Sequence, residues 1–474
     1  MTEKARTNWA GERFGAWLAR PLASFHLIVT IATLLTVLGL VMVLSASSVE
    51  SYAGGGSAYT LFVQQAMFAA LGAVAFYIAL RLPLRLVRQW SFPIFFASVV
   101  ALLLVLIPGI GAVHGGARRW FDIGPLSIQP SEVVKVTLVV WGAHLLATRR
   151  GAPLKDILVP VLPAGLLVCL LVILEPNLST TIALGVVLMA LLWFGGLPWK
   201  IFAGAMITGM IAAMVLALSA GYRSDRMRAF FNPGDDPQGI NYQARQAKYS
   251  LADGGIWGRG LGQSRAKWSY LPNSHNDFIF AIIGEELGFL GCMLVLALFA
   301  MFAYTGIRIA LRSNDPFLRL LTATATTWIT AQALINIGYV VGLLPVTGLQ
   351  LPLVSAGGSS LAITLFMFGL IASAARHEPE AVAALQAGQD GRLSRLLRLP
   401  VPDLYIPGKA DAPRKAAPAK AKPKPKPKPA ARREAQPQPR RRAPQGRGAS
   451  SLRSTRAWEP TYPMPHPKER GRSR

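Results

Sequence analysis

Asp277 stands at a boundary between a polar stretch of the chain and an apolar one. It follows Pro272-Asn273-Ser274-His275-Asn276 and precedes Phe278-Ile279-Phe280. Partial desolvation at such a boundary raises the pKa of a carboxyl group, which suits a general base working near neutral pH. A simpler interpretation is that Asp277 caps the helix expected to begin there. The residues alone leave both interpretations open.

Further ionisable residues lie in or beside apolar runs, where charge is costly and marks a candidate functional position. One of them, Glu175, stands between two such runs. Glu132 and Lys135 are spaced i,i+3, so we expect them to pair with each other. Glu285 and Glu286 follow Asp277 by about two helical turns, and we expect one of them to bond to another helix.

Two segments expected outside the membrane carry positive charge. One is the connection 109–130, and the other is the 56-residue loop 221–276. A long loop can cross a membrane whatever its charge, but cations gathered there also suit an anionic partner. They are Arg118 and Arg119 in the connection, and Arg223, Arg226, Arg228, Arg245, Lys248, Arg259, Arg265 and Lys267 in the loop.

Two more features of the segments expected outside the membrane are weaker evidence for a chemical role. His275 has no second His or Cys nearby, which leaves a zinc site unsupported and favours a hydrogen-bonding loop histidine. The sequence Gly357-Gly358-Ser359-Ser360 opens an expected helix. Backbone N–H groups at such a helix start form a plausible phosphate cradle, although Gly and Ser also begin ordinary membrane helices.

The composition indicates the elements that hold these residues. Of the 474 residues, 52% are hydrophobic and only 15% are charged, against about 25% charged in an ordinary soluble domain. A soluble globular protein and a largely disordered chain are therefore both excluded. Ten apolar runs approach the length that crosses a bilayer, and they predict an all-α, polytopic membrane protein. The runs are 25–46, 59–80, 91–108, 131–147, 157–174, 179–195, 199–220, 277–307, 319–344 and 358–375.

Positive charge in the short loops predicts the orientation of these helices. With the N-terminal segment 1–24 in the cytoplasm, the short cationic connections also lie there. The opposite connections 48–58, 175–178 and 345–357 contain no Lys or Arg. Ten spans then place the C-terminus in the cytoplasm and the loop 221–276, between the seventh and eighth helices, outside.

The formal net charge of +26 is concentrated beyond the apolar body. Residues 376–474 contain 24 Lys and Arg against 8 Asp and Glu, a net charge of +16, and include a Lys-Pro repeat. We predict a basic, disordered cytoplasmic tail, with Leu393–Leu399 as a short basic helix on the inner leaflet. No aromatic stacking pattern accompanies these cations, which argues against nucleic acid. Cys169 and Cys292 lie in apolar runs and predict no disulfide framework.

Several ordered motifs over residues 25–376 resemble the SEDS family (shape, elongation, division and sporulation), most of all its FtsW-type division proteins. Many relatives have Glu and Thr where this chain has Asn273 and Asn276, and Gln-Pro-Asp-Leu-Gly where it has residues 175–179. The matching motifs are Met42–Ser48, Arg118-Arg119-Trp120, Gln129–Lys135, Gly258–Gly262, Tyr270-Leu271-Pro272, His275–Ala281, Glu285–Gly288, Asn336-Ile337-Gly338 and Pro352–Ser360.

The resemblance implies a ten-helix domain at 25–375 that polymerises lipid II as a peptidoglycan glycosyltransferase. The essential loop carboxylate of the family falls on Asp277. We assign substrate binding to Arg118, Arg119, Arg259, Lys267, His275, Ser355, Gly357 and Gly358, and a supporting role to Glu132, Lys135, Glu285, Glu286 and Pro352. No resident metal site is evident, although a divalent cation, Mg or Mn, could share the work at the pyrophosphate.

The resemblance also implies partners and a location. A class B penicillin-binding transpeptidase and other division proteins are the expected partners, together with membrane lipids. The expected location is the bacterial cytoplasmic membrane at the division septum. Two alternatives remain open: a transporter that flips lipid II between leaflets, and a division scaffold whose tail recruits cytoplasmic proteins.

Overall fold

A computed structural model describes residues 20–53, 57, 59–114, 116–124, 126–219, 230–231, 242–265, 275–389 and 392–405. Several of the predictions above lie outside these residues: the substrate-binding role of Lys267, the motifs at 270–274, and the tail beyond 405. All of these described residues belong to one compact unit of the chain.

A long helix occupies each of the ten apolar runs within the described residues. Six of them are long and apolar enough to span a membrane: α2, α3, α6, α9, α12 and α14. α5, α7 and α8 contain shorter apolar stretches, and α13 buries several Thr, Gln and Asn side chains. The bounds are α2 Ala23–Ala53, α3 Thr60–Arg81, α5 Ser91–Leu106, α6 Pro130–Thr148, α7 Leu154–Leu174, α8 Leu178–Phe194, α9 Trp199–Ser219, α12 Ile279–Arg312, α13 Pro316–Val340 and α14 Ser359–Arg376.

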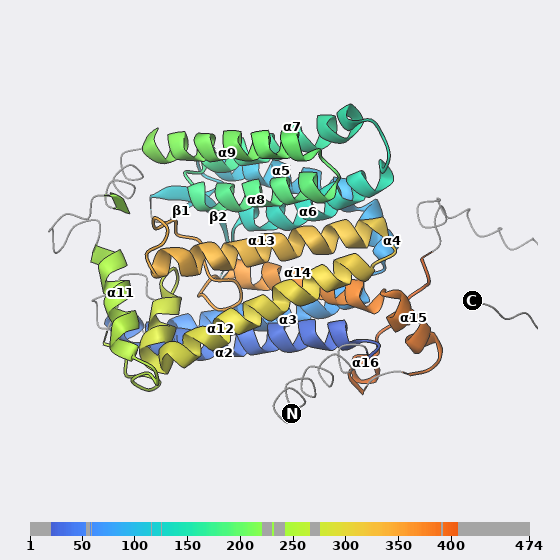
Figure 1. Ribbon diagram of the computed structural model, residues 1–474. Coiled ribbons are helices and arrows are strands. Elements are labelled where there is room, and N and C mark those ends of the chain that lie inside the picture. The colour runs from blue at the N-terminus through green and yellow to red at the C-terminus, as the bar shows by residue number, and fades with distance from the viewer. Residues whose placement is uncertain are drawn as a thin grey trace, which may run out of the picture. The chain divides into compact units, whose positions relative to one another are not determined.

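The shorter elements gather at the two ends of these helices, as Figure 1 shows. One end carries α11 (Tyr242–Gly254) and the strands β1 and β2, and the other carries α4 (Leu84–Gln89), α15 (Pro379–Gln386) and α16 (Arg392–Leu396). The elements expected outside the membrane therefore lie together, opposite those expected in the cytoplasm.

The connection 109–130 contains a small antiparallel sheet that the prediction of an all-α chain omits. Its strands are β1 (Ala112–His114), β2 (Ala117–Ile123) and β3 (Leu126–Ile128), in the order β1-β2-β3. His114 pairs with Ala117 across the intervening Gly-Gly, a sequence that suits a two-residue hairpin turn. This sheet fixes the directions in which the side chains of β2 point.

Two glycines permit close approaches that shape the outer half of the bundle. A Cβ atom at Gly39, in α2, would lie 2.6 Å from the carbonyl oxygen of Leu353, so the loop 345–358 packs directly on the backbone of α2. Gly288 interrupts α12 with φ of +68°, a conformation that L-residues rarely adopt. A Cβ atom there would collide with the backbone of Gly258 and Ile256.

The predicted boundary at 375 between the membrane domain and a disordered tail is placed too early. α15 follows α14 directly, and Arg312 of α12 donates to both carboxylate oxygens of Glu380, at 2.6 Å. Further along, the Tyr77 hydroxyl donates to the carbonyl of Leu397 at 3.2 Å, and Arg376 donates to that of Pro400 at 3.0 Å. Residues 377–389 and 392–405 thus belong to the folded unit, because apolar and polar contacts tie them to its helices.

Candidate active site

The turn that carries Asp277 is fastened by its backbone to two other segments. Asn336 Nδ2 and the Tyr339 hydroxyl, both on α13, donate to the carbonyl oxygen of Asp277 at 3.0 and 2.9 Å. The backbone N–H of Ala356 donates to the carbonyl of His275 at 3.0 Å. α12 begins at Ile279 with Phe278 as its N-cap residue, so Asp277 is not the cap.

Below this turn, α13 presents a stripe of polar side chains to the interior of the bundle. Trp328, Gln332, Asn336 and Tyr339 recur at spacings of three or four residues, which places them on one helix face. All four are buried or nearly so. The stripe links the Asp277 turn to the middle of the membrane-spanning region, where polar groups are retained only with partners.

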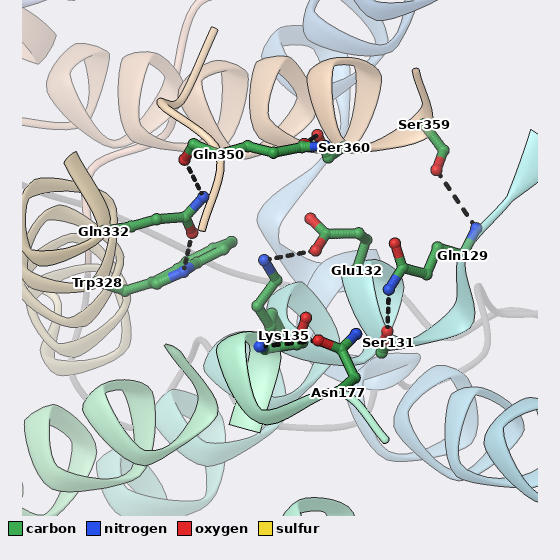
Figure 2. Close-up of polar contacts among 11 residues, drawn as sticks. Gln129, Ser131, Glu132, Lys135, Asn177, Trp328, Gln332, Gln350, Ser359 and Ser360 are labelled. Atoms are coloured by element: carbon green, nitrogen blue, oxygen red, sulfur yellow. Dashed lines mark hydrogen bonds and ion pairs between the residues drawn. The ribbon is translucent and has the colours of Figure 1, made fainter. Parts of the chain in front are cut away.

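Figure 2 shows a polar network in which side chains of α6, α13, α14 and the loop 345–358 lie near one another and form separate groups of hydrogen bonds. Trp328 Nε1 donates to Gln332 Oε1, and Gln332 Nε2 donates to the Gln350 carbonyl, both at 3.0 Å. The Ser360 hydroxyl donates to Gln350 Oε1 at 2.8 Å. On the far side, the backbone N–H of Gln129 donates to the Ser359 hydroxyl at 3.3 Å.

Glu132 and Lys135 lie within this network and form an ion pair. Lys135 Nζ lies 2.8 Å from Glu132 Oε1, and the two side chains are 1% and 11% exposed. The ammonium group also lies 5.0 Å from the ring centroid of Trp328, within the range of a cation–π interaction. This is the i,i+3 pairing that the spacing predicts, although it does not by itself decide whether the pair also contacts a ligand.

Arg118 and Arg119 have different surroundings in the structure, although the sequence predicts the same role for both. The register between β1 and β2 shifts beside these two residues, so the alternation of a regular strand does not place their side chains. The Arg118 guanidinium donates to the carbonyl of Leu106 at the end of α5, at 3.3 Å. Arg119 lies close enough to Glu175 to affect its titration. Arg119 is therefore the arginine on the side of the polar interior, whereas Arg118 bonds to a helix end.

Glu175 lies between α7 and α8 and is fully buried. Burial raises the pKa of its carboxyl group to about 8, although the charge of Arg119 and the neighbouring Ser131 hydroxyl lower it. Ser131 in turn accepts a hydrogen bond from Gln129 Nε2 at 2.8 Å. A carboxyl group with this pKa is mostly protonated at neutral pH, so it adds little negative charge to this buried region.

Glu285 and Glu286 bind the external segment that precedes the Asp277 turn. Glu285 accepts from the Ser264 hydroxyl and from the backbone N–H of Arg265, both at 2.7 Å. Glu286 accepts from the Ser45 hydroxyl of α2 at 2.6 Å and from the backbone N–H of Ser264 at 3.3 Å. Both carboxylates thus bind the loop. The bond to another helix that we expect of one of these glutamates is the one that Ser45 of α2 donates to Glu286.

The remaining predicted binding residues make contacts within the protein. Arg259 pairs with Asp253 at 3.1 Å, both partly exposed in the outer loop. Ser355 and Pro352 are buried in the loop 345–358, where Ser355 Oγ accepts from the N–H of Leu351 at 2.8 Å. At the start of α14, the N–H groups of Ser360 and Leu361 already bond to the carbonyls of Gly357 and Gly358. These bonds occupy part of the proposed phosphate cradle.

Sequence reasoning missed the network formed by Gln129, Trp328, Gln332, Gln350 and Ser359. A usable signal was present, since Gln332 and Asn336 are polar residues four apart inside an apolar run. Among the described residues, no three His, Cys, Asp or Glu side chains come together as metal ligands.

The arrangement of a kinked helix, a fastened acidic turn and a polar interior also occurs in known proteins. A family model of cell cycle proteins, named for FtsW, RodA and SpoVE, matches residues 25–380. The chain belongs to the FtsW/RodA/SpoVE family. This membership confirms the resemblance to the SEDS proteins and the polytopic helical fold that the resemblance implied.

Individual members of the FtsW/RodA/SpoVE family agree with this assignment. A protein of Mycobacterium tuberculosis named probable peptidoglycan glycosyltransferase FtsW is 55% identical over 402 residues, which cover 84% of this chain and 77% of that protein. A chain from a peptidoglycan synthase complex that coordinates polymerization and crosslinking is 28% identical, with a TM-score of 0.60, over 77% of this chain and 99% of that one. The rod shape determining protein RodA of Thermus thermophilus is 27% identical, with a TM-score of 0.57, over the same shares.

Proposed function

We propose that the chain is a peptidoglycan glycosyltransferase that polymerises lipid II in the bacterial cytoplasmic membrane during septal wall synthesis. The names of its relatives support the reaction class, and its spanning helices support a multi-pass membrane protein. The observation that carries the assignment of the site is the fastening of the Asp277 turn, through its backbone, at the top of the polar stripe of α13.

In the proposed reaction, Asp277 acts as the general base. Its carboxylate takes the proton from the 4-hydroxyl of the acceptor N-acetylglucosamine, and that oxygen attacks the anomeric carbon of the donor N-acetylmuramic acid. The bond from this carbon to the pyrophosphate breaks with inversion, which forms a β-1,4 linkage and releases undecaprenyl pyrophosphate. General-base catalysis is typically worth about 10²–10⁴-fold.

The leaving pyrophosphate needs positive charge near it, because its negative charge grows as the bond breaks. We assign this role first to Arg119, whose charge lies near the buried Glu175, and then to Arg118 and Arg259. Lys267 keeps its predicted role as a further cation, and His275 and the 357–358 segment keep theirs in substrate binding. A divalent cation, Mg or Mn, keeps its place in the proposal as a further positive charge at the pyrophosphate.

The proposed protein partner is a class B penicillin-binding transpeptidase. The synthase complex whose chain resembles this one coordinates polymerization with crosslinking, which supports a transpeptidase partner as a class. Other division proteins are proposed as partners of the cytoplasmic tail, and no role in nucleic acid binding is proposed.

The deciding experiment is lipid II polymerisation by the purified protein, with and without a transpeptidase partner. Asp277→Asn should abolish polymer while the protein stays folded, because Asn nearly keeps the size of the side chain and keeps the backbone oxygen that accepts from Asn336 and Tyr339. Asp122→Asn is the matched control, since Asp122 is an exposed acid of the outer sheet that bonds only to nearby groups such as Ser127. Near-normal polymer from Asp277→Asn would overturn the assignment of the base.

The same purified protein also distinguishes the proposed enzyme from a transporter and from a scaffold. A transporter would exchange labelled lipid II between the leaflets of vesicles without forming polymer, whereas an enzyme forms glycan strands. A scaffold that acts through its tail alone would lose its function when residues 406–474 are deleted, whereas polymerisation should survive that deletion.

A further inference from the structure

The segment that follows α15 exposes apolar side chains beside basic ones. Leu396, Val401 and Leu404 are 78%, 50% and 58% exposed, and the side chains of Arg395 and Arg398 are exposed as well. Asp403 is the one acid in residues 392–405, against three arginines. An exposed leucine between arginines is typical of a surface that meets both the apolar and the charged layers of a membrane.

This segment is held to the membrane helices on its other side. Leu397 and Leu399 pack against the hydrophobic core, and Ser394 is buried. The Tyr77 hydroxyl of α3 donates to the carbonyl of Leu397, and Arg376 at the end of α14 donates to the carbonyl of Pro400. The side chains of residues 396 and 398 are therefore exposed because their neighbours face inward.

The hydrogen bond from Tyr77 to Leu397 indicates how deep the segment after α15 lies relative to the membrane surface. Tyr77 lies four residues before Arg81, the last residue of α3, which corresponds to about 6 Å along the helix axis. The neighbouring side chains Val74 and Ile78 on α3 are 57% and 48% exposed, as expected for residues that face lipid. Interfacial helices bury their apolar face about 5–10 Å into the boundary between headgroups and acyl chains, so Leu396 lies at a matching level.

We propose that residues 394–404, which we call the interfacial segment, form a binding surface for anionic phospholipid headgroups of the inner leaflet. Leu396, Val401 and Leu404 enter the apolar edge of the leaflet, and Arg395 and Arg398 contact the headgroup phosphates. Charge complementarity favours this occupant, because the cytoplasmic leaflet is negatively charged. The proposal does not depend on the reaction that the outer half of the protein catalyses.

The magnitude follows from the two exposed arginines. Each Lys or Arg near an anionic membrane surface strengthens attraction roughly fivefold, so Arg395 and Arg398 together contribute about 25-fold. Binding of the interfacial segment would hold the start of the cytoplasmic tail at the membrane surface.

The test uses full-length protein in vesicles and a spin label at one engineered cysteine. Cys169→Ala and Cys292→Ala remove the native thiols, and the label is then placed at Leu396→Cys or at the matched control Gln386→Cys, an exposed position on α15. Collision rates with oxygen, which partitions into lipid, and with a water-soluble nickel chelate give an immersion ratio for each site. Monodispersity in detergent checks that each variant is folded.

In vesicles containing phosphatidylglycerol, the immersion ratio at Leu396→Cys should exceed that at Gln386→Cys. The ratio at residue 396 should fall when Arg395→Gln and Arg398→Gln are combined, and also when all the lipid is phosphatidylcholine. Equal ratios at residues 396 and 386 would overturn the surface itself. A high ratio that is the same in both lipids and in the arginine variant would overturn the recognition of anionic headgroups.

Discussion

The ion pair between Glu132 and Lys135 allows a test that separates a structural role from a role in substrate binding. The perturbation is Lys135→Met, which keeps much of the length of the side chain and removes its charge. The Lys135 side chain is 1% exposed and its Nζ lies 2.8 Å from Glu132 Oε1, so the substitution leaves a carboxylate in a nearly dry site. Glu132→Gln removes the opposite charge, and the double variant removes both.

The magnitude follows from that geometry. At 2.8 Å and an effective dielectric constant near 20, the attraction between the charges is about 6 kcal/mol. Desolvation of the two ions consumes several kcal/mol of this, so the net contribution of the pair is small. Removal of one partner alone should cost about 3–5 kcal/mol, with part of the cost of Lys135→Met due to the lost contact with Trp328. The double variant should recover to within about 1–2 kcal/mol of the wild type.

The assay is reversible unfolding by SDS in mixed micelles, combined with lipid II polymerisation for the same four proteins. A stable double variant with normal polymer would make the pair structural, whereas a stable but inactive one would place the pair in contact with substrate. If the double variant were no more stable than the worse single variant, the reasoning about an uncompensated buried charge would be refuted.

Three further predictions follow from the outer half of the molecule. Glu285→Gln cannot accept both of its present hydrogen bonds, so it should cost about 1.5–3 kcal/mol and raise proteolysis of the outer loop; an unchanged cleavage rate would contradict this. Gly39→Val should displace the loop that contains Leu353 and lower the melting temperature, whereas Gly204→Ala, at an open position on α9, should not. Because Glu175 binds a proton more tightly when folded, wild-type stability should fall as the pH rises from about 4.5 to about 8, by at most about 1.4 kcal/mol per pH unit; in Glu175→Gln, a melting temperature with the same pH dependence would contradict the raised pKa.

Much of the fold could be predicted from the sequence because each spanning helix is a local feature. An apolar run of sufficient length is its own signal, and the charges of the short loops orient the set. The i,i+3 pair of Glu132 and Lys135 is likewise local. The sheet at 112–128 was missed because its strands are short, although the Gly-Gly before Ala117 suits a hairpin.

The parts of the site that escaped prediction depend on contacts between distant residues. Nothing in the sequence near Glu285 indicates that it binds the backbone of Arg265, and Gln332 and Gln350 meet only because a loop folds back on α13. The different surroundings of Arg118 and Arg119 depend on a sheet whose register shifts beside them, which the sequence does not reveal. Periodicity in a helical run predicts which face is polar, but only the packed structure shows which partners that face meets.

The hydrogen bonds to the backbone of Asp277 help to explain how a single carboxylate is positioned for catalysis in this fold. Its backbone oxygen accepts from neutral donors of α13, an amide and a phenol, which fix the turn without adding a charge beside the carboxylate. Glu285 and Glu286 accept hydrogen bonds from the preceding loop and from Ser45 of α2, which stabilise these two buried carboxylates. The donors of α13 thus position the turn that carries the base. Tyr339→Phe should therefore reduce turnover by loosening the turn, while the pH profile of polymerisation keeps the midpoint of the wild type; a shifted midpoint would show that Tyr339 also sets the titration of Asp277.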